Sequence, residues 1–204
     1  QSRSSAASDV YKRQVHNYGI QKGDRVAIAM RNYPEWIVAF AAITSIGGIA
    51  VALNAWWVTD ELEYGLKDSG SKLVIVDEER VKRIAPILEA SEAGAIAIRV
   101  TGELPSGIDR YEDVVELGAE MPEIAIDTDD DATILYTSGT TGFPKGAVST
   151  HRAVLSALVG FACRAEVGKL TGSGGEVGAG DSDPAVILCV PLFHVTGLVP
   201  VMMG

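Results

Sequence analysis

The sequence predicts an α/β fold, a mainly parallel sheet with helices on both faces, and two observations lead to this prediction. Short β-prone runs alternate along the chain with helix-length runs, which is the order typical of βαβ units. Several of the β-prone runs are apolar throughout, as expected for parallel strands that are buried on both faces. In such a fold the crossovers are right-handed and ligands bind at the carboxyl ends of the strands.

Each element has its own signal. The second expected helix begins with Thr59 as a capping residue and stops at Gly70. Trp56 and Trp57, just before it, are interpreted as packing residues at a strand end rather than as a ligand platform. The Gly-, Ser- and acid-rich stretch at residues 168–183 is interpreted as a surface excursion. The expected strands are residues 25–30, 49–53, 72–76, 95–100, 132–136 and 185–190, and the expected helices lie near residues 34–46, 59–69, 78–90 and 152–162.

The composition narrows the function classes. Of the 204 residues, 47% are hydrophobic, which is enough for a substantial core. A formal net charge of -10 argues against nucleic-acid binding, which needs clustered Lys and Arg. Cys163 and Cys189 stand alone in apolar runs without metal-ligand spacing, so we expect buried thiols in a reducing compartment and no metal site built by the protein.

Two uncharged stretches are long enough to cross a bilayer, but neither is expected to do so. Residues 36–58 are interrupted by polar residues and glycines. Residues 185–204 contain Pro191, His194 and Pro200. We therefore expect a cytoplasmic protein without a transmembrane segment.

The most informative segment is YTSGTTGFPKGA, residues 136–147. Its glycines let the backbone approach an anion, its hydroxyls can donate hydrogen bonds, and Lys145 adds a positive charge. Composition alone suggests a plain flexible loop instead. Phosphate binding is favoured because an apolar strand precedes the loop, a helix is expected to follow it, and Pro144 stiffens it. Lys145 lacks the flanking residues of a Walker motif, and Gly172 and Gly174 do not begin a dinucleotide motif.

These residues resemble a known family. TSGTTGFPKG, residues 137–146, is similar to the phosphate-loop signature of the adenylate-forming superfamily, which contains acyl-CoA synthetases, luciferases and nonribosomal peptide adenylation domains. PLFHVTG, residues 191–197, resembles a segment of the acyl- and aryl-CoA synthetase branch that carries a histidine near the acyl pocket. GDRVAIAM, NYPEW and GGIAVALN look like the first half of the family's large N-terminal domain.

The resemblance implies ATP-dependent activation of a fatty or other hydrophobic carboxylic acid to an acyl-adenylate, followed by transfer to coenzyme A. The implied cofactors are ATP, Mg²⁺ and coenzyme A, with Mg²⁺ held mostly through phosphate oxygens and water. The phosphate loop is expected to bind the β and γ phosphates of ATP. Its implied residues are Thr137, Ser138, Gly139, Thr140, Thr141, Gly142 and Lys145.

Two histidines receive different interpretations. Spacing alone favours a core or capping role for His194, but its PLFHVTG context implies a residue that lines or gates the acyl site. The catalytic roles are thus expected of Lys145 and His194. His151 stands at a helix start after Ser149 and Thr150 and is interpreted as a contributor to capping.

Both ends of the chain suggest a piece of a longer protein. DVYKRQ, residues 9–14, is the translation of GAT GTG TAT AAG AGA CAG, the end of a transposon adapter used for sequencing libraries, so residues 1–14 are expected to be translated adapter. Residues 15–204 are expected to be an incomplete N-terminal AMP-binding domain, since the chain stops in an apolar segment without a cap. The family's ribose-binding acid, hinge and C-terminal lysine are expected beyond residue 204, so the chain alone is expected to be inactive.

Two other interpretations stay open. Within the same superfamily, the protein could be a nonribosomal-peptide-type adenylation domain or an aryl-CoA ligase, which a substrate screen by pyrophosphate release would separate. From another class, it could be a nucleotide-binding module without catalysis. A P-loop phosphotransferase is disfavoured by the residues beside Lys145.

Overall fold

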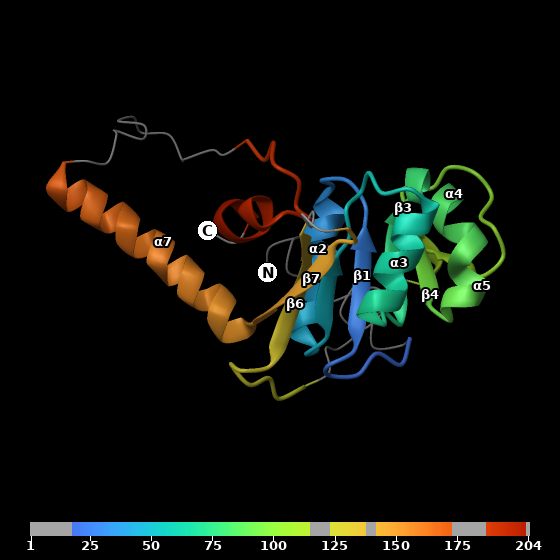
Figure 1. Cartoon of the computed structure of the whole chain (residues 1–204), viewed down its shortest axis with the longest axis horizontal. Helices are drawn as coiled ribbons and strands as arrows, with labels where there is room; N and C mark the ends of the chain where they lie inside the picture. Colours follow the sequence, from blue (N-terminus) through green and yellow to red (C-terminus); the bar gives the residue numbers. More distant parts are fainter. Residues whose placement is uncertain (1–17, 115–122, 138–141, 173–186, 203–204) are drawn as a thin grey trace.

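The computed structural model describes residues 18–114, 123–137, 142–172 and 187–202. In these residues one seven-stranded sheet has the strand order β5-β4-β3-β1-β2-β6-β7 (Figure 1). Neighbouring strands are parallel except β6 and β7, which are antiparallel. The strands are β1 (Arg25–Ala29), β2 (Ile49–Ala52), β3 (Leu73–Asp77), β4 (Gly94–Ile98), β5 (Ile108–Arg110), β6 (Asp131–Thr137) and β7 (Lys145–Thr150).

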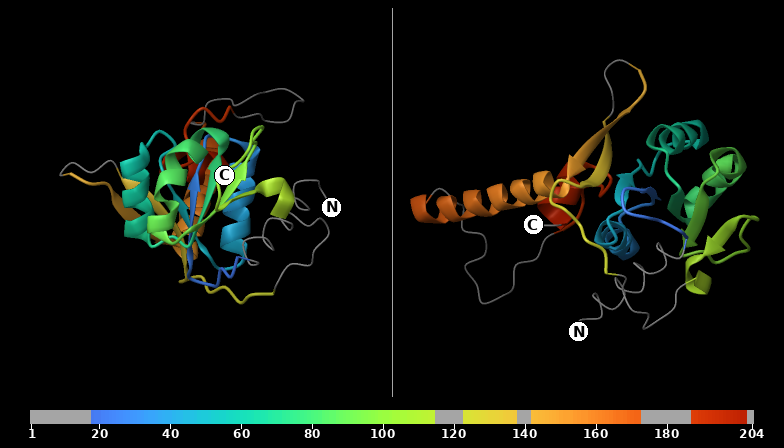
Figure 2. Two further views of the ribbon diagram at one scale, coloured as in Figure 1. Left: turned by 90° about the vertical axis from the view of Figure 1, so that its right-hand side faces the viewer. Right: turned by 90° about the horizontal axis from the view of Figure 1, so that it is seen from below.

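Helices cover both faces of the sheet, so the predicted fold class is confirmed. Helix α2 packs on one face, and α3, α4 and α5 pack on the other (Figure 2). Helix α7 extends away from the sheet (Figure 1). The helices are α2 (Pro34–Ser45), α3 (Thr59–Ser69), α4 (Glu78–Ile84), the 3-10 turn η1 (Ala85–Ile87), α5 (Leu88–Ser91), α6 (Tyr111–Val114), α7 (His151–Thr171) and the π-helical η2 (Gly197–Met202).

Strand β1 shows why the central strands read as continuous apolar runs. Val26 and Ile28 pack into the core formed with α2, whereas Ala27 and Ala29 pack into the core formed with α3 and α4. All four side chains are fully buried. Successive side chains point to opposite faces, so a strand covered on both faces must be apolar at every position.

The segment after β6 differs from the prediction. Residues 145–150 were expected to be loop leading into a helix, but they form β7, which pairs antiparallel with β6 before α7 begins. The phosphate-loop segment therefore connects two strands of a hairpin and does not run into a helix N-terminus. Strand β7 lies at the sheet edge and is largely exposed, so its sequence lacks the apolar pattern of a buried strand.

The predicted strand at residues 185–190 and the predicted start of the surface excursion at residue 168 were both wrong. Residues 187–190 form no strand, and residues 185–186 lie outside the described part. Helix α7 continues to Thr171 and ends at Gly172 with a φ of 66°, so residues 168–171 are helical. The remainder of the expected surface excursion, residues 173–183, lies outside the described residues.

The cysteine prediction was also wrong, since Cys163 and Cys189 are both exposed. Cys163 lies on α7, where Val154 is the one described residue that is buried, so apolar neighbours in the sequence do not imply a core position.

The capping prediction for α3 was half right. Thr59 is the first helical residue and not the N-cap, which is Val58. The carboxylate of Glu61 accepts from the Val58 backbone N–H at 2.9 Å. Gly70 ends the helix in the left-handed conformation with a φ of 61°, as predicted.

Candidate functional site

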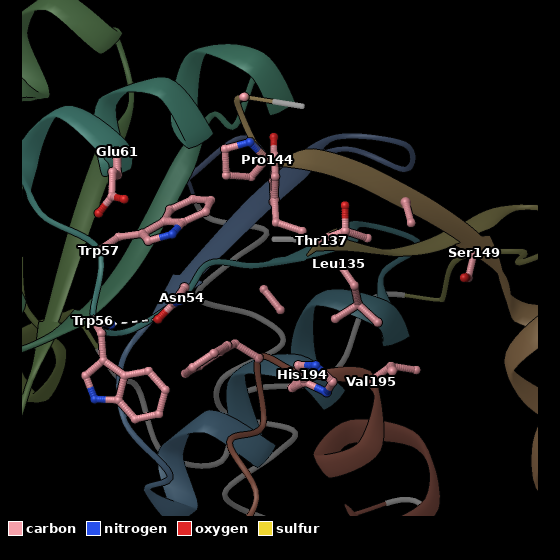
Figure 3. A pocket seen from close by; sticks show the side chains of 15 residues that line it. Asn54, Trp56, Trp57, Glu61, Leu135, Thr137, Pro144, Ser149, His194 and Val195 are labelled. Atoms are coloured by element: carbon pink, nitrogen blue, oxygen red, sulfur yellow. Dashed lines mark hydrogen bonds between the residues drawn. The ribbon is translucent and has the colours of Figure 1, made fainter. Parts of the chain in front are cut away.

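A cavity of about 830 Å³ lies at the carboxyl ends of β2 and β6 (Figure 3). Three segments far apart in the sequence form it: the β2–α3 connection, the β6–β7 hairpin and residues 193–195. This position agrees with the expectation that ligands bind at the carboxyl ends of parallel strands. Its lining residues are Ala52, Asn54, Trp56, Trp57, Glu61, Leu135, Tyr136, Thr137, Gly142, Pro144, Ala147, Ser149, Phe193, His194 and Val195.

The described part of the phosphate-loop segment lies at this cavity. Thr137 and Gly142 both line it, and the Thr137 hydroxyl donates to the Lys145 carbonyl at 3.3 Å. Gly142 has a φ of 129°, which side chains rarely adopt, so a glycine is required there. The other predicted phosphate-binding residues, Ser138, Gly139, Thr140 and Thr141, lie outside the described residues.

Lys145 is not among the described residues that line the cavity, although Pro144 directly before it is. It is exposed and pairs with Thr137 across the hairpin. Because side chains alternate along a strand, Lys145 belongs to the same face as Ala147 and Ser149, which line the cavity. None of the described lining residues is Lys or Arg, and Lys145 pairs with Thr137, which does line the cavity.

His194 faces the same cavity from the other side, and its segment is fastened to the end of β1. The side-chain oxygen of Asn32 accepts from the Leu192 backbone N–H at 2.9 Å, and its amide nitrogen donates to the Val190 carbonyl at 2.8 Å. Leu192 is fully buried in the core beside α2. The NYPEW segment thus fixes the chain two residues before His194.

Local geometry completes the turn around His194. Its backbone N–H donates to the Pro191 carbonyl at 3.1 Å, and its own carbonyl accepts from the Leu198 N–H at 3.0 Å. A Cβ at Gly197 would overlap the Pro191 carbonyl. The last glycine of PLFHVTG is therefore needed for close backbone contact.

Two tryptophans line the cavity although they were not predicted as site residues. Trp57 is 8% exposed and packs edge-on against Tyr136, with 5.4 Å between ring centroids. Trp56 is 60% exposed and packs edge-on against Phe193 at 5.2 Å. The predicted packing contacts are present, and both side chains also line the cavity (Figure 3). Their place in the connection after β2 was the signal that could have identified them.

Helix α4 holds the tryptophan segment in place. The Arg80 Nε donates to the Ala55 carbonyl at 2.7 Å, and Arg83 donates to the Trp57 carbonyl at 2.9 Å. Arg80 is fully buried and pairs with Asp77 at 3.0 Å. Sequence reasoning missed these contacts because they join α4 to a segment about 25 residues earlier.

His151 does not cap α7. The Thr150 hydroxyl accepts from the Ala153 backbone N–H at 3.2 Å and is the N-cap, which corrects the interpretation of His151. His151 is the first helical residue, and it does not line the main cavity.

A second cavity of about 460 Å³ adjoins the first and shares Leu135, Ser149 and Val195 with it. It lies between the hairpin, α7 and η2, and most of its lining is apolar. Its other lining residues are Thr133, Ala153, Val154, Ala157, Phe161, Thr196 and Val199.

Neither a metal site nor a membrane span is evident in the part of the chain that the structure describes. Residues 18–114, 123–137, 142–172 and 187–202 contain no group of three or more His, Cys, Asp or Glu side chains placed to hold a metal ion. Within the same residues, no helix combines the length and apolar character needed to cross a bilayer.

Comparison with known proteins gives consistent matches. The chain is 35% identical over 202 residues to 4-coumarate--CoA ligase 2 of Oryza sativa, covering 93% of this chain and 34% of that protein. It is 33% identical over 186 residues to the long-chain-fatty-acid--CoA ligase FadD13 of Mycobacterium tuberculosis, covering 91% and 34%. The chain thus spans about a third of the length of these relatives.

A solved structure supports the same assignment. ATP-bound MatB from Rhodopseudomonas palustris matches with a TM-score of 0.74 and 28% identity, covering 95% of this chain and 35% of that one. The family model described as AMP-binding enzyme matches residues 13–204. The chain therefore belongs to the AMP-binding enzyme family, whose matched relatives are acid–CoA ligases.

Proposed function

We propose that this chain forms the ATP-binding part of an acid–CoA ligase that activates a hydrophobic carboxylic acid. The full reaction is proposed for a protein of the relatives' length, since the chain spans about a third of them. The carboxylate attacks the α-phosphate of ATP, pyrophosphate leaves, and the thiol of coenzyme A then displaces AMP from the acyl-adenylate. The chain alone is proposed to bind ATP weakly and not to complete this reaction.

One observation carries the proposal. Thr137 and Gly142 of the phosphate-loop segment line the same cavity as His194, although the segments are about 50 residues apart. Two anions must approach each other in the first step, so the site must supply positive charge and hydrogen-bond donors. The Asn54 amide and the Ser149 hydroxyl are donors among the described lining residues, and Lys145, which pairs with the lining residue Thr137, is proposed to supply the positive charge.

The described residues fit bound ATP better than an isolated metal ion. The cavity combines hydroxyls and glycine backbone with aromatic rings, which suits phosphates at one end and an apolar group at the other. Mg²⁺ is proposed to be held by phosphate oxygens and water, because Mg²⁺ usually keeps several waters and is bound through few carboxylates. Glu61 is the carboxylate among the described lining residues.

The acid is proposed to be hydrophobic because of the second cavity. Leu135 and Val195 line both cavities, so an acyl group attached at the first can extend into the second. The matched relatives are named for coumarate, succinylbenzoate and long-chain fatty acids, which leaves fatty and aromatic acids for experiment to separate.

A titration of the 204-residue chain with Mg·ATP tests the binding step. Lys145→Met should weaken ATP binding by about 10- to 100-fold, because a charged hydrogen-bonding group contributes about 1.5–3 kcal/mol. Lys169→Met is the matched control, since that lysine lies on α7 with a 73% exposed side chain. Binding that is absent, or equal in the two variants, would contradict the proposal.

A second experiment tests the reaction. A protein extended to the length of the relatives should release pyrophosphate with fatty or aromatic acids and form the thioester with coenzyme A. Release that depends on an amino acid and is not followed by thioester formation would instead indicate a peptide-type adenylation domain. ATP binding without any pyrophosphate release would indicate a non-catalytic nucleotide-binding module.

A further inference from the structure

Helix α3 contacts the hairpin residues directly before Lys145. The Tyr64 hydroxyl donates to the Pro144 carbonyl at 3.0 Å. Its ring stacks on Phe143, with 5.0 Å between centroids and 25° between planes. Tyr64 therefore holds the two residues directly before Lys145, one by a hydrogen bond and one by ring stacking.

The same helix holds the other limb of the hairpin. The Tyr136 hydroxyl donates to the Asp68 carboxylate at 2.7 Å. Tyr64 and Asp68 are four residues apart and lie one turn from each other on α3. Both sides of the hairpin thus contact one face of α3. Helix α3 is itself packed on the sheet through the buried Leu62 and Leu66.

The contacts of Tyr64 hold a part of the hairpin that lies at the edge of the sheet. Strand β7 lies at the sheet edge and pairs with β6 alone, and Phe143 is 74% exposed. Pro144 has no backbone N–H, so its carbonyl is its one polar backbone group, and Tyr64 satisfies it. Without Tyr64, the backbone entering Lys145 would be fixed by the β6 pairing only from Lys145 onward.

We propose that Tyr64 is a positioning residue that holds the backbone before Lys145, so that the lysine meets the terminal phosphates of ATP. This inference rests on the proposed function and assigns a role to a residue outside the phosphate-loop segment. Partial burial and the nearby Asp68 carboxylate raise the pKa of Tyr64 above its ordinary value.

The test compares ligands with and without terminal phosphates. Tyr64→Phe keeps the ring and removes the hydroxyl, and should weaken binding of Mg·ATP and of inorganic tripolyphosphate by about three- to tenfold. AMP binding should change less than twofold, because AMP has no phosphate at the position of Lys145. Tyr64→Leu, which also removes the stacking, should cause a larger loss of the same kind.

A matched control separates positioning from general loss of structure. Tyr18→Phe likewise removes a phenol hydroxyl, which donates to Asp109 at 2.5 Å near the opposite edge of the sheet. It should leave the affinities for ATP, tripolyphosphate and AMP unchanged. Thermal unfolding of each variant checks that the 204-residue chain is folded during the titrations, and Tyr64→Phe remains informative if Tyr64→Leu unfolds.

A double-mutant cycle tests whether Tyr64 acts through the lysine. In the Lys145→Met background, Tyr64→Phe should cause no further loss of tripolyphosphate binding, since the group that it positions is absent. Additive losses, or equal losses for AMP and ATP, would overturn the role of Tyr64 while leaving ATP binding intact. If the unaltered chain bound neither ATP nor tripolyphosphate, the proposed function would fail and this inference with it.

Discussion

The carboxyl ends of β1 and β3 and the carboxyl ends of β2 and β6 lie on the same side of one sheet, yet they are used differently. The order β2-β1-β3-β4-β5 reverses direction at β1 and β3, where doubly wound folds commonly bind ligands. Here that point holds the buried Asp77–Arg80 ion pair, and the main cavity lies at β2 and β6 instead. The main cavity thus lies where the parallel part of the sheet adjoins the antiparallel β6–β7 hairpin.

The ion pair at the carboxyl ends of β1 and β3 fills this region with contacts that hold the fold together. Asp77 accepts from the Arg31 backbone N–H at 3.0 Å and from the Arg80 backbone N–H at 3.1 Å, in addition to pairing with the Arg80 guanidinium. Arg80 in turn fixes the Ala55 carbonyl beside the cavity. The charged groups of the first region therefore support the walls of the second.

The largest expected effect tests that support. Arg80→Met should lower the free energy of unfolding by about 3–5 kcal/mol, because it leaves Asp77 buried without its charge partner. Chemical denaturation of the 204-residue chain measures it. Arg83→Met is the comparison, since Arg83 is partly exposed and its loss should cost less. Equal costs for the two variants would show that the buried pair is not what stabilises this end of the sheet.

A smaller loss of stability is expected where Asn32, just after β1, bonds the backbone before His194. Asn32→Ala should lower the free energy of unfolding by about 1–3 kcal/mol, because the Leu192 N–H and the Val190 carbonyl lose their partner. Faster amide hydrogen exchange at Leu192 would locate the change. Unchanged exchange there would mean that the Asn32 bonds do not hold the segment against the sheet.

The smallest effect concerns pH. Partial burial raises the pKa of Glu79, but the guanidinium groups of Arg80, Arg31 and Arg83 outweigh it and hold that pKa below its ordinary value. A carboxyl whose pKa is lower in the folded state adds stability above its unfolded pKa of about 4.3, and that stability is lost as the pH falls through the folded value.

Glu79→Gln should therefore make unfolding stability depend less on pH between about pH 5 and 3. Denaturation midpoints of both chains across this range measure the difference. A variant with the same acid dependence as the unaltered chain would remove Glu79 from the charge network that distinguishes the β1–β3 end.

The central sheet could be predicted because burial on both faces leaves a strong mark in the sequence. The predicted strands at residues 25–30 and 72–76 correspond to β1 and β3. Strand β7 was missed because an exposed edge strand places no such demand on its residues. Strand β5 has three residues, which is too short for a pattern to appear.

The candidate site was predictable in part. Thr137, Gly142 and His194 were named from local motifs and lie at one cavity, whereas their catalytic and binding roles remain predictions. Trp56 was considered and set aside as a packing residue, and Glu61 was not considered. Nothing in the sequence around either residue indicates that it lines one cavity with a hairpin about 80 positions later.

The sequence by itself determined the alternating order of elements and the loop chemistry, because apolar periodicity, glycines and hydroxyls act within a few residues of one another. The tertiary structure decided that the loop joins two antiparallel strands, that Asn32 fastens the segment before His194, and that Tyr64 contacts the backbone before Lys145. The contacts of Tyr64 and Asn32 join residues 80 and 160 positions apart in the chain, so packing of the sheet had to bring them together.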